Sequence, residues 1–321
     1  MGSGEVMIRR NRLAFLLVCL LLLGALSAYA QEKTRSKFEI FSVRNLYISK
    51  SSFDDGSESP DGQKRMLSIN MFDATLNIPT RFQDGKTVII HSLGYQLLEF
   101  NRWETAAGGL NPAYEVVNRL DDFTAVEYRL LALHSFSGDR WRWWLVSYHG
   151  LYSDFTGGLS SGDYRLQAAL AIERTWESGA VFGLGLAYSS TISFPVLPVL
   201  TLHTSPESAF KLDLTLPLNG TLTYRVSEKA EVGIAGAVEG NRYNLQEIKS
   251  QNSPAVTNNL RYSAGTIGPR AKLRVAGPCY LVVDAGRTFR RRLEFFNGNS
   301  KTGEIDLENN WFARIAFNVE L

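Results

Sequence analysis

The feature that most constrains this chain is an alternation of apolar with small or polar residues that recurs after residue 30. In residues 181–190, every second position holds a large apolar or aromatic side chain, and the intervening positions hold small residues. Residues 164–175 and 266–275 alternate in a similar way. Because successive side chains of a β-strand point to opposite faces, this pattern predicts two-faced strands. No stretch after residue 30 approaches eighteen apolar residues, which excludes a helical membrane protein.

The solvent around these strands must be inferred from other features, since a soluble β-sandwich shows the same alternation. Aromatic residues lie at the ends of the apolar faces, as Phe182 and Tyr188 do. Trp141, Trp143 and Trp144 begin a strand just after a tight turn. Aromatic girdles at the two membrane interfaces have this form, so these residues favour a membrane barrel.

Connections between the expected strands alternate in length along the chain. Compact turns occur at residues 137–140, 177–180, 227–229 and 276–278. Long polar segments occur at residues 50–64, 102–122, 153–163, 241–258 and 291–310. Short turns on one rim and long loops on the other are typical of outer-membrane barrels.

The chain ends on an amphipathic strand. Its apolar face comprises Trp311, Ala313, Ile315, Phe317, Val319 and Leu321. A terminal strand of this kind resembles the signal that the outer-membrane insertion machinery reads. We therefore expect Phe317, Val319 and Leu321 to form an insertion signal, with that machinery as a partner.

The expected fold class is all-β, a closed antiparallel transmembrane β-barrel of about 12 to 14 strands. Closure is required because open strand edges would expose unpaired N–H and C=O groups to lipid, at a cost of several kcal/mol each. The strand count depends on residues 193–229. Three strands, at residues 198–204, 209–216 and 221–226, would give the higher count, and one long strand bulged around Pro217 would give the lower.

The N-terminal segment has the three parts of an export signal. Three arginines precede an apolar run over residues 13–26, and small residues follow at Ala28 and Ala30. The run is shorter than the roughly 20 residues that span hydrocarbon. We therefore expect a signal peptide over residues 1–30, cleaved after Ala30, and one barrel domain over residues 31–321. The expected location is the outer membrane of a Gram-negative bacterium.

Composition limits the partners. Lys and Arg number 34 against 32 Asp and Glu, so no basic excess is present to neutralise phosphates and nucleic acid is not expected. Removal of the signal would leave Cys279 as the one cysteine, which can form no internal disulfide. No His, Asp and Glu cluster has metal-ligand spacing, so neither a metal nor a cofactor is expected. The expected partners are outer-membrane lipid and lipopolysaccharide.

Residues 198–244 carry a loose motif. It consists of Leu216-Pro217, then Leu222-Thr223-Tyr224-Arg225, a Ser-Glu-Lys turn, and a strand rich in Gly and Ala that ends near Gly240 and Tyr243. This stretch resembles an uncharacterised family of bacterial outer-membrane β-barrels, defined only as a domain of unknown function, and the resemblance extends over most of the chain after residue 30. It implies a barrel without a biochemical role, so no functional residue is carried over.

Charged residues on the polar faces of the strands are expected to line the lumen. The candidates are Glu127, Arg129, Arg165, Glu173, Glu231, Arg270, Lys272, Arg274, Asp284, Arg290 and Arg314. Such charges could select solutes in an open pore, or they could pair across strands and fill a narrow lumen. Both signs are present, four acidic and seven basic, which favours pairing.

The expected function is a non-catalytic channel or a structural barrel, with an unknown solute. The alternatives are a lipid-modifying outer-membrane enzyme and a surface-binding protein that acts through its extracellular loops. For an enzyme, the His-x-Ser pair formed by His203 and Ser205 would hold a base and a nucleophile on one strand face. Pro206 follows Ser205 and no acidic partner is evident in the sequence, so a polar turn is the favoured interpretation.

Overall fold

The computed structural model describes residues 38–53, 65–82, 86–102, 117, 120, 122–136, 138, 140–191, 195–205, 207–249 and 256–320. The expected signal peptide and Leu321 lie outside these residues. Within them, no helix is long and apolar enough to cross a membrane.

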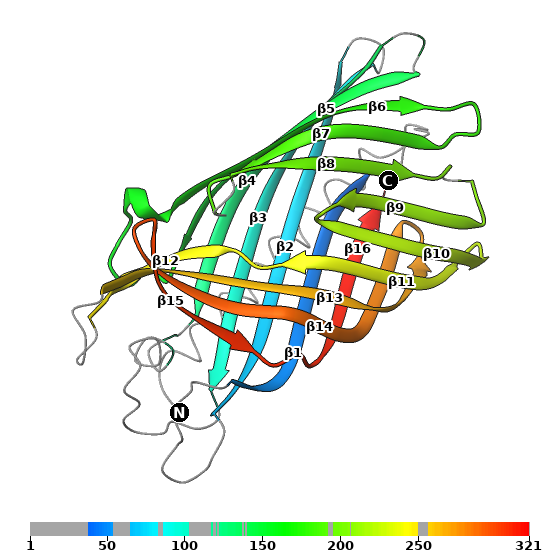
Figure 1. Cartoon of the computed structure of the whole chain (residues 1–321). Coiled ribbons are helices and arrows are strands. Elements are labelled where there is room, and N and C mark those ends of the chain that lie inside the picture. Colours follow the sequence, from blue (N-terminus) through cyan, green and yellow to red (C-terminus); the bar gives the residue numbers. More distant parts are fainter. Residues whose placement is uncertain are drawn as a thin grey trace.

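Fourteen antiparallel strands close into a barrel, and two further strands extend it (Figure 1). The wall runs in chain order from β1 to β11 and continues through β13, β14 and β16, which pairs with β1. Its strands are β1 (Glu39–Phe53), β2 (Arg65–Phe82), β3 (Thr87–Arg102), β4 (Phe123–Phe136), β5 (Trp141–Ser153), β6 (Tyr164–Thr175), β7 (Val181–Ser189), β8 (Val196–His203), β9 (Phe210–Leu216), β10 (Asn219–Ser227), β11 (Ala230–Glu239), β13 (Val256–Ala276), β14 (Cys279–Asn297) and β16 (Trp311–Glu320). The additional strands are β12 (Arg242–Lys249) and β15 (Ser300–Leu307).

The structure resolves the strand count that the sequence leaves open. The segment over residues 193–229 forms the three strands β8, β9 and β10, which confirms the higher of the two predicted counts. The prediction of polar loops at residues 241–258 and 291–310 is wrong in part, because β12 and β15 lie within these segments. Each forms a ladder with the far end of a long wall strand, β12 with β13 and β15 with β14.

The two ends of the barrel differ in their connections. β1 begins and β16 ends at one end, where short segments join β4 to β5, β6 to β7, β10 to β11 and β13 to β14. We call it the turn end; it lies on the right in Figure 1. We call the opposite end the loop end.

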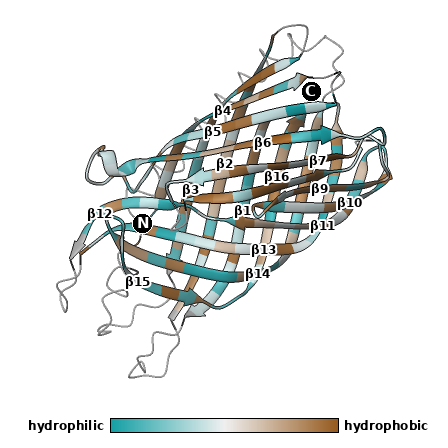
Figure 2. Cartoon of the chain, turned by 45° about the horizontal axis from the view of Figure 1, so that its top comes forward, coloured by the Kyte–Doolittle hydropathy of each residue, from teal (hydrophilic) through white to brown (hydrophobic). Residues whose placement is uncertain are grey.

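The outer face of the barrel carries an apolar band between aromatic side chains, and Figure 2 shows hydrophobic and hydrophilic residues alternating along the strands. Exposed aromatic residues toward the turn end are Phe82, Phe136, Trp141, Trp176, Phe182, Phe210, Tyr224 and Phe317. Those toward the loop end are Tyr47, Tyr164, Tyr188, Phe289 and Trp311. Exposed aliphatic residues between them include Leu170, Leu184, Leu186, Leu222, Ile234, Ile267 and Ile315. Such a surface suits hydrocarbon flanked by two interfaces.

One of the three tryptophans expected in the girdle points the other way. Trp141 is exposed on the outer face, but the indole N–H of Trp144 donates to Glu173 Oε1 at 2.8 Å inside the barrel. The expectation is wrong for Trp144 because adjacent residues of a strand point to opposite faces, so Trp143 and Trp144 cannot both face lipid.

The long strands continue past the short ones at the loop end and enclose a second, smaller ring. There β12 leaves the wall and meets the end of β5 through the pair Asn244 and Ser153, while β15 meets the end of β1 through Leu307 and Phe53. The ring is therefore formed by β1 to β5 together with β12 to β15.

An apolar core fills this ring. It contains Leu46, Ile48, Leu67, Ile69, Met71, Leu98, Phe100, Val117, Leu120, Phe123, Ala125, Tyr152, Tyr243, Leu245, Leu260, Tyr262, Ala264, Leu293, Phe295, Ile305, Leu307 and Phe312. The core is closed to water, since none of these side chains is more than 6% exposed. A membrane barrel ordinarily has an apolar outside and a polar inside, so this end of the chain is built like a soluble domain.

The terminal strand yields a prediction about assembly. Phe317 is exposed on the outer face of β16, whereas Val319 packs against Ile40 and Phe41. We expect Phe317→Asp, or deletion of residues 317–321, to reduce barrel levels in the outer membrane, because the change removes the apolar end of this face. Membrane fractionation and the difference in gel mobility between boiled and unboiled samples would measure it. Asn318→Asp is the matched control, since Asn318 lines the polar interior; normal assembly of the Phe317 variant would contradict the prediction.

Candidate functional site

The inward faces of the long strands change from polar to apolar along their length. On β2, Asp73 and Thr75 line a cavity toward the turn end, whereas Met71, on the same face and nearer the loop end, belongs to the apolar core. On β1, Arg44 lines the cavity and Leu46 lies in the core. The interior is thus divided into a polar lumen toward the turn end and an apolar core toward the loop end.

The lumen cavity has a volume of about 690 Å³. Acidic and basic side chains line it in equal number: Glu39, Asp73, Glu127, Glu239 and Glu320, with Arg44, Arg129, Arg270, Lys272 and Arg314. Most form close pairs across strands, including Arg44 with Asp73 at 3.0 Å and Lys272 with Glu320 at 2.5 Å, and Arg129 pairs with Glu127 on its own strand at 3.6 Å. The structure therefore has the cross-strand pairing that the sequence favours.

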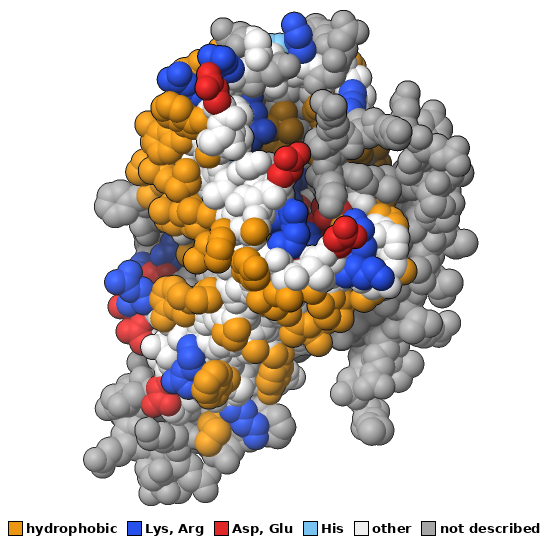
Figure 3. Space-filling model, turned by 90° about the vertical axis from the view of Figure 1, so that its right-hand side faces the viewer, with side chains coloured by type: hydrophobic (Ala, Val, Ile, Leu, Met, Phe, Trp, Pro, Cys, Tyr) orange, Lys and Arg blue, Asp and Glu red, His pale blue; other side chains and the backbone are white. Residues whose placement is uncertain are grey.

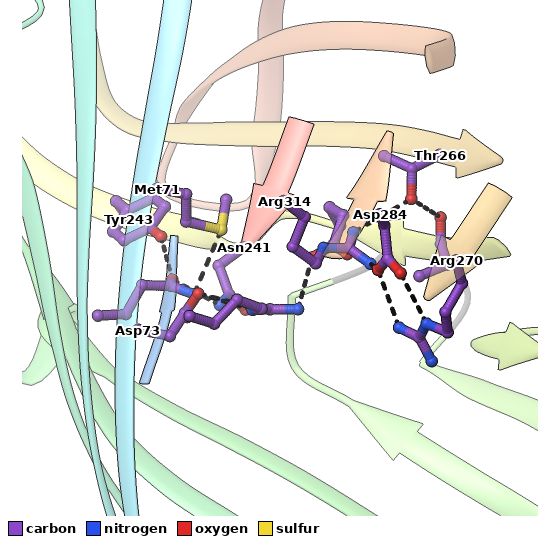
Figure 4. A network of polar contacts seen from close by, with 12 residues as sticks. Met71, Asp73, Asn241, Tyr243, Thr266, Arg270, Asp284 and Arg314 are labelled. Carbon is purple, nitrogen blue, oxygen red and sulfur yellow. Dashed lines mark hydrogen bonds and ion pairs between the residues drawn. The ribbon is translucent and has the colours of Figure 1, made fainter. Parts of the chain in front are cut away.

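A buried ion network forms one side of the lumen (Figure 4). Asp284 accepts from both Arg270, with Nε–Oδ1 at 2.7 Å and Nη2–Oδ2 at 2.9 Å, and Arg314, with Nη1–Oδ2 at 3.1 Å. Arg314 also pairs with Glu239, which in turn lies 3.4 Å from Arg44. Asp284 is 1% exposed. These charges are buried together, and the network joins β1, β11, β13, β14 and β16.

A chain of amide contacts crosses the top of the lumen cavity. Gln167 Nε2 lies 3.4 Å from Asn241 Oδ1, and Asn241 Nδ2 donates to Gln96 Oε1 at 3.2 Å. Gln96 Nε2 donates to Asp73 Oδ1 at 2.6 Å, and the Tyr243 hydroxyl donates to Gln96 Oε1 (Figure 4). We call the Gln96, Asn241 and Gln167 contacts the amide bridge. Its three residues line the lumen cavity, and a second space lies at the loop end.

That second space, the rim cavity, has a volume of about 590 Å³ and lies outside the apolar core, between β12, β13 and the loop ends of β6 and β7. Arg165, Arg242 and Arg261 line it. Arg165 precedes Gln167 by two residues, so it lies on the same face of β6 and nearer the loop end. Arg242 directly follows Asn241 in the sequence. Residues two apart in a strand lie roughly 7 Å from one another, so the rim cavity is adjacent to the amide bridge.

Contacts from the connection between β5 and β6 hold β12 over the lumen. Asp163 Oδ1 accepts from Asn244 Nδ2 at 2.8 Å, Asp154 N donates to Asn244 O at 3.2 Å, and Gln246 N donates to Asp154 Oδ2 at 2.9 Å. Burial raises the pKa of the Asp163 carboxyl, but hydrogen bonds from Ser160 and Asn244 outweigh burial and leave that pKa below its ordinary value. The carboxylate is therefore ionised where it holds the strand.

At the turn end, the lumen cavity adjoins a mouth cavity of about 410 Å³. Both are lined by Lys272 and Glu320, and the mouth also contains Lys211, Arg225 and Arg274. Figure 3, which views the turn end, shows a hollow with charged side chains of both signs around it.

The structure places the lumen candidates in several environments. Glu127, Arg129, Arg270, Lys272 and Arg314 line the lumen cavity; Asp284 is buried behind it; Arg274 and Glu231 line the mouth; and Arg165 lines the rim cavity. Glu173 is buried between strands, where it accepts from Arg142, Trp144 and Thr201. Arg44, Asp73 and Glu239 were not among the candidates, although Arg44 and Asp73 alternate with apolar neighbours on their strands in the same way.

Arg290 differs from the other candidates, because it is exposed and its neighbour Arg291 is buried in its place. Arg290 has a positive φ of 50°, at the point where β14 changes partner from β16 to β15. One extra residue there inverts the inward and outward alternation. Arg291 then points into the ring, where it donates to Ser51 and to Glu308 O.

The His203 and Ser205 pair does not form a nucleophile and base. His203 Nδ1 lies 3.1 Å from Asp213 Oδ1 and its Nε2 lies 3.9 Å from Glu173 Oε1, so both ring nitrogens face carboxylates. Ser205 Oγ instead accepts the Glu207 N–H at 3.4 Å. Across the described part of the chain, no three His, Cys, Asp or Glu residues are grouped as metal ligands.

This charged lumen inside a fourteen-stranded wall defines an outer-membrane type of β-barrel. The chain belongs to a family described as a domain of unknown function (DUF6268), whose profile matches residues 26–319. No curated protein matches it in sequence.

Several solved barrels are similar in structure. The COG4313 outer membrane channel from Pseudomonas putida F1 is 11% identical, with a TM-score of 0.43 over 90% of this chain and 100% of that one. The TodX monoaromatic hydrocarbon channel, in a deltaS2 mutant, is 8% identical, with a TM-score of 0.40 over 89% of this chain and 90% of that one. A Pseudomonas aeruginosa FadL homologue is 10% identical, with a TM-score of 0.28 over 89% and 90% of the two chains. Similarity at this level identifies neither a solute nor a route.

Proposed function

We propose that this protein is a narrow outer-membrane channel for small polar solutes, with its turn end in the periplasm. The observation that carries the proposal is the succession of polar spaces through the barrel. The mouth and lumen cavities share Lys272 and Glu320, and the rim cavity is lined by Arg165 and Arg242, which are close in sequence to Gln167 and Asn241 of the amide bridge. This succession passes beside the apolar core rather than through it.

The amide bridge is the narrowest point proposed for this route. Its groups are neutral amides, and one of its contacts, between Gln167 and Asn241, is long at 3.4 Å. Separating these side chains breaks no ion pair. The ion pairs of the lumen cavity, nearer the turn end, hold the strands of the wall together. A solute that offers hydrogen bonds could replace the amide contacts as it passes. The route has no catalytic step.

Single-channel recording of the refolded protein in planar bilayers tests the proposal. We expect the wild type to show small, brief conductance steps, and Gln167→Ala with Asn241→Ala to raise the conductance several-fold, because shortening both side chains widens the constriction. Gln246→Ala is the matched control, since the Gln246 side chain is exposed on β12. Its conductance should equal that of the wild type.

The apolar core favours a second candidate, a closed barrel that acts through its loop end. Absence of conductance from both the wild type and the double variant, with both proteins folded, would support this candidate and contradict the channel.

A further inference from the structure

The rim cavity gathers three arginines with too few acids to neutralise them. Arg261 has a carboxylate partner, Glu294, which Lys301 shares at 3.1 Å. Neither Arg165 nor Arg242 lies within ion-pair distance of a carboxylate in the part of the chain that the structure describes. These two guanidinium groups therefore have no ion-pair partner of their own, and the charges of Asp163 and Glu294 act on Arg165 and Arg242 only from farther away.

Both of these arginines are buried, since Arg165 is 9% and Arg242 is 7% exposed. Arg165 donates to Gly162 O, to Tyr164 O and, at 2.5 Å, to Asn259 Oδ1, but its Nε has no partner. Arg242 donates to Gly298 O, and its Nε also has no partner. Buried charged donors without acceptors are costly, so an acceptor supplied from outside would be strongly favoured.

The arginines are held in fixed positions that suit an oxyanion. The guanidinium groups of Arg242 and Arg261 lie 4.3 and 5.3 Å from the ring centroid of Phe296. Burial, and then the positive charges of Arg165 and Arg261, lower the pKa of Arg242 to about 10. This arrangement disfavours the ligand-free protein, and neutralisation by an anion would relieve it. Planar guanidinium groups pair bidentately with phosphate oxygens.

The remaining lining of the cavity indicates what the anion is attached to. Asn299 offers an amide, Ser189 and Ser190 offer hydroxyls, and Tyr188 offers an aromatic ring. Amides and hydroxyls bind sugar hydroxyl groups, and aromatic rings pack against sugar faces. A volume of about 590 Å³ admits one phosphorylated sugar unit.

We propose that the rim cavity binds a sugar phosphate through Arg165 and Arg242. The same chemistry is present in a free sugar phosphate and in the phosphorylated sugar headgroup of lipopolysaccharide. The rim cavity is open to both sources, because Tyr188, which lines it, is itself one of the exposed aromatic residues at the loop end. The site does not depend on conduction through the amide bridge.

Calorimetric titration of the refolded full-length protein with glucose 1-phosphate, and with inorganic phosphate, tests the site. Loss of one charge-assisted contact should weaken binding roughly ten- to a hundred-fold in Arg242→Gln and in Arg165→Gln. Arg292→Gln is the matched control, since Arg292 is a loop-end arginine that pairs with Asp306 at 2.8 Å on the exposed surface. It should bind as the wild type does.

The lipid source is tested in a second arm, with nanodiscs that contain or lack lipopolysaccharide. A rise in unfolding temperature with lipopolysaccharide that Arg242→Gln abolishes, without binding of glucose 1-phosphate, assigns the site to the headgroup. Binding of the soluble sugar phosphate assigns it to a free solute. Both results support the site.

The stability of the ligand-free protein distinguishes a binding role of Arg242 from a purely structural one. We expect Arg242→Gln without ligand to be at least as stable as the wild type, because one of three neighbouring positive charges is gone. The proposal is overturned if the wild type binds neither glucose 1-phosphate nor lipopolysaccharide, or if Arg242→Gln and Arg165→Gln both bind with wild-type affinity.

Discussion

Asp284→Ala is expected to lower the free energy of unfolding by about 3 kcal/mol, because it leaves the partly buried Arg270 without its anion and the buried Arg314 with one anion instead of two. Arg270 would lose two hydrogen bonds to one carboxylate, and Arg314 would lose one of its two acidic partners. The side chain of Arg314 is 6% exposed, so water could not replace the lost partner without opening the wall. The large effect arises from the unpaired charge that remains, rather than from the pair itself.

Urea titration of the protein folded in lipid vesicles would measure this change. Glu177→Ala is the matched control, since Glu177, in the turn between β6 and β7, pairs at 3.6 Å with Arg140, in the turn between β4 and β5, and both side chains are largely exposed. That variant should change the free energy of unfolding by about 1 kcal/mol or less. Equal effects of the two substitutions would mean that the lumen around Asp284 is hydrated like the surface.

The wall of the barrel is predictable from the sequence because lipid outside and water inside impose a strict alternation. Residues of the segment 181–190 obey it completely, and β7 has the faces that the alternation predicts. Even residues 193–229, where Pro217 interrupts the pattern, resolve into strands close to the predicted ranges. Local sequence is enough to predict a strand and its two faces where odd positions face one environment and even positions face the other.

The apolar core could not be predicted in this way, because the inward face of one strand changes from polar to apolar residues along its length. On β1, Leu46 and Ile48 point inward and Tyr47 points outward, so three consecutive apolar residues replace the alternation. Strand length gives a second signal. β13 and β14 have 21 and 19 residues, about twice the roughly 9 to 11 that cross a bilayer. The excess length extends beyond the membrane and builds the ring.

Pairing in the interior depends on contacts that are distant in sequence. Arg314 and Glu239 are 75 residues apart, and only the order of strands around the wall brings them together. Arg290 illustrates a different limit, because one residue with positive φ reverses the parity of everything beyond it on β14. Nothing in the run of three arginines at residues 290–292 shows which of them turns inward.

The orientation of β7 gives the most direct prediction about the membrane. Leu184 is 59% exposed on the outer face, at mid-height between the aromatic residues. Leu184→Arg should therefore lower the free energy of unfolding by roughly 2 to 4 kcal/mol in a bilayer, because it places a charge in hydrocarbon. A soluble sandwich with Leu184 in its core would also be destabilised, so stability alone does not identify the solvent.

A fluorophore on Leu184→Cys, in a Cys279→Ser background, separates the two cases. A quencher carried in the lipid acyl chains should strongly reduce its emission. The inward control is Ala187→Cys rather than Gly185→Cys, because a Cβ at Gly185 would lie 2.2 Å from Leu170 O. A label at 187 should escape the lipid quencher and respond to aqueous iodide. Quenching by lipid that is equal at 184 and 187, or absent at 184, would mean that this face does not contact hydrocarbon, and the apolar outer band would then need another partner.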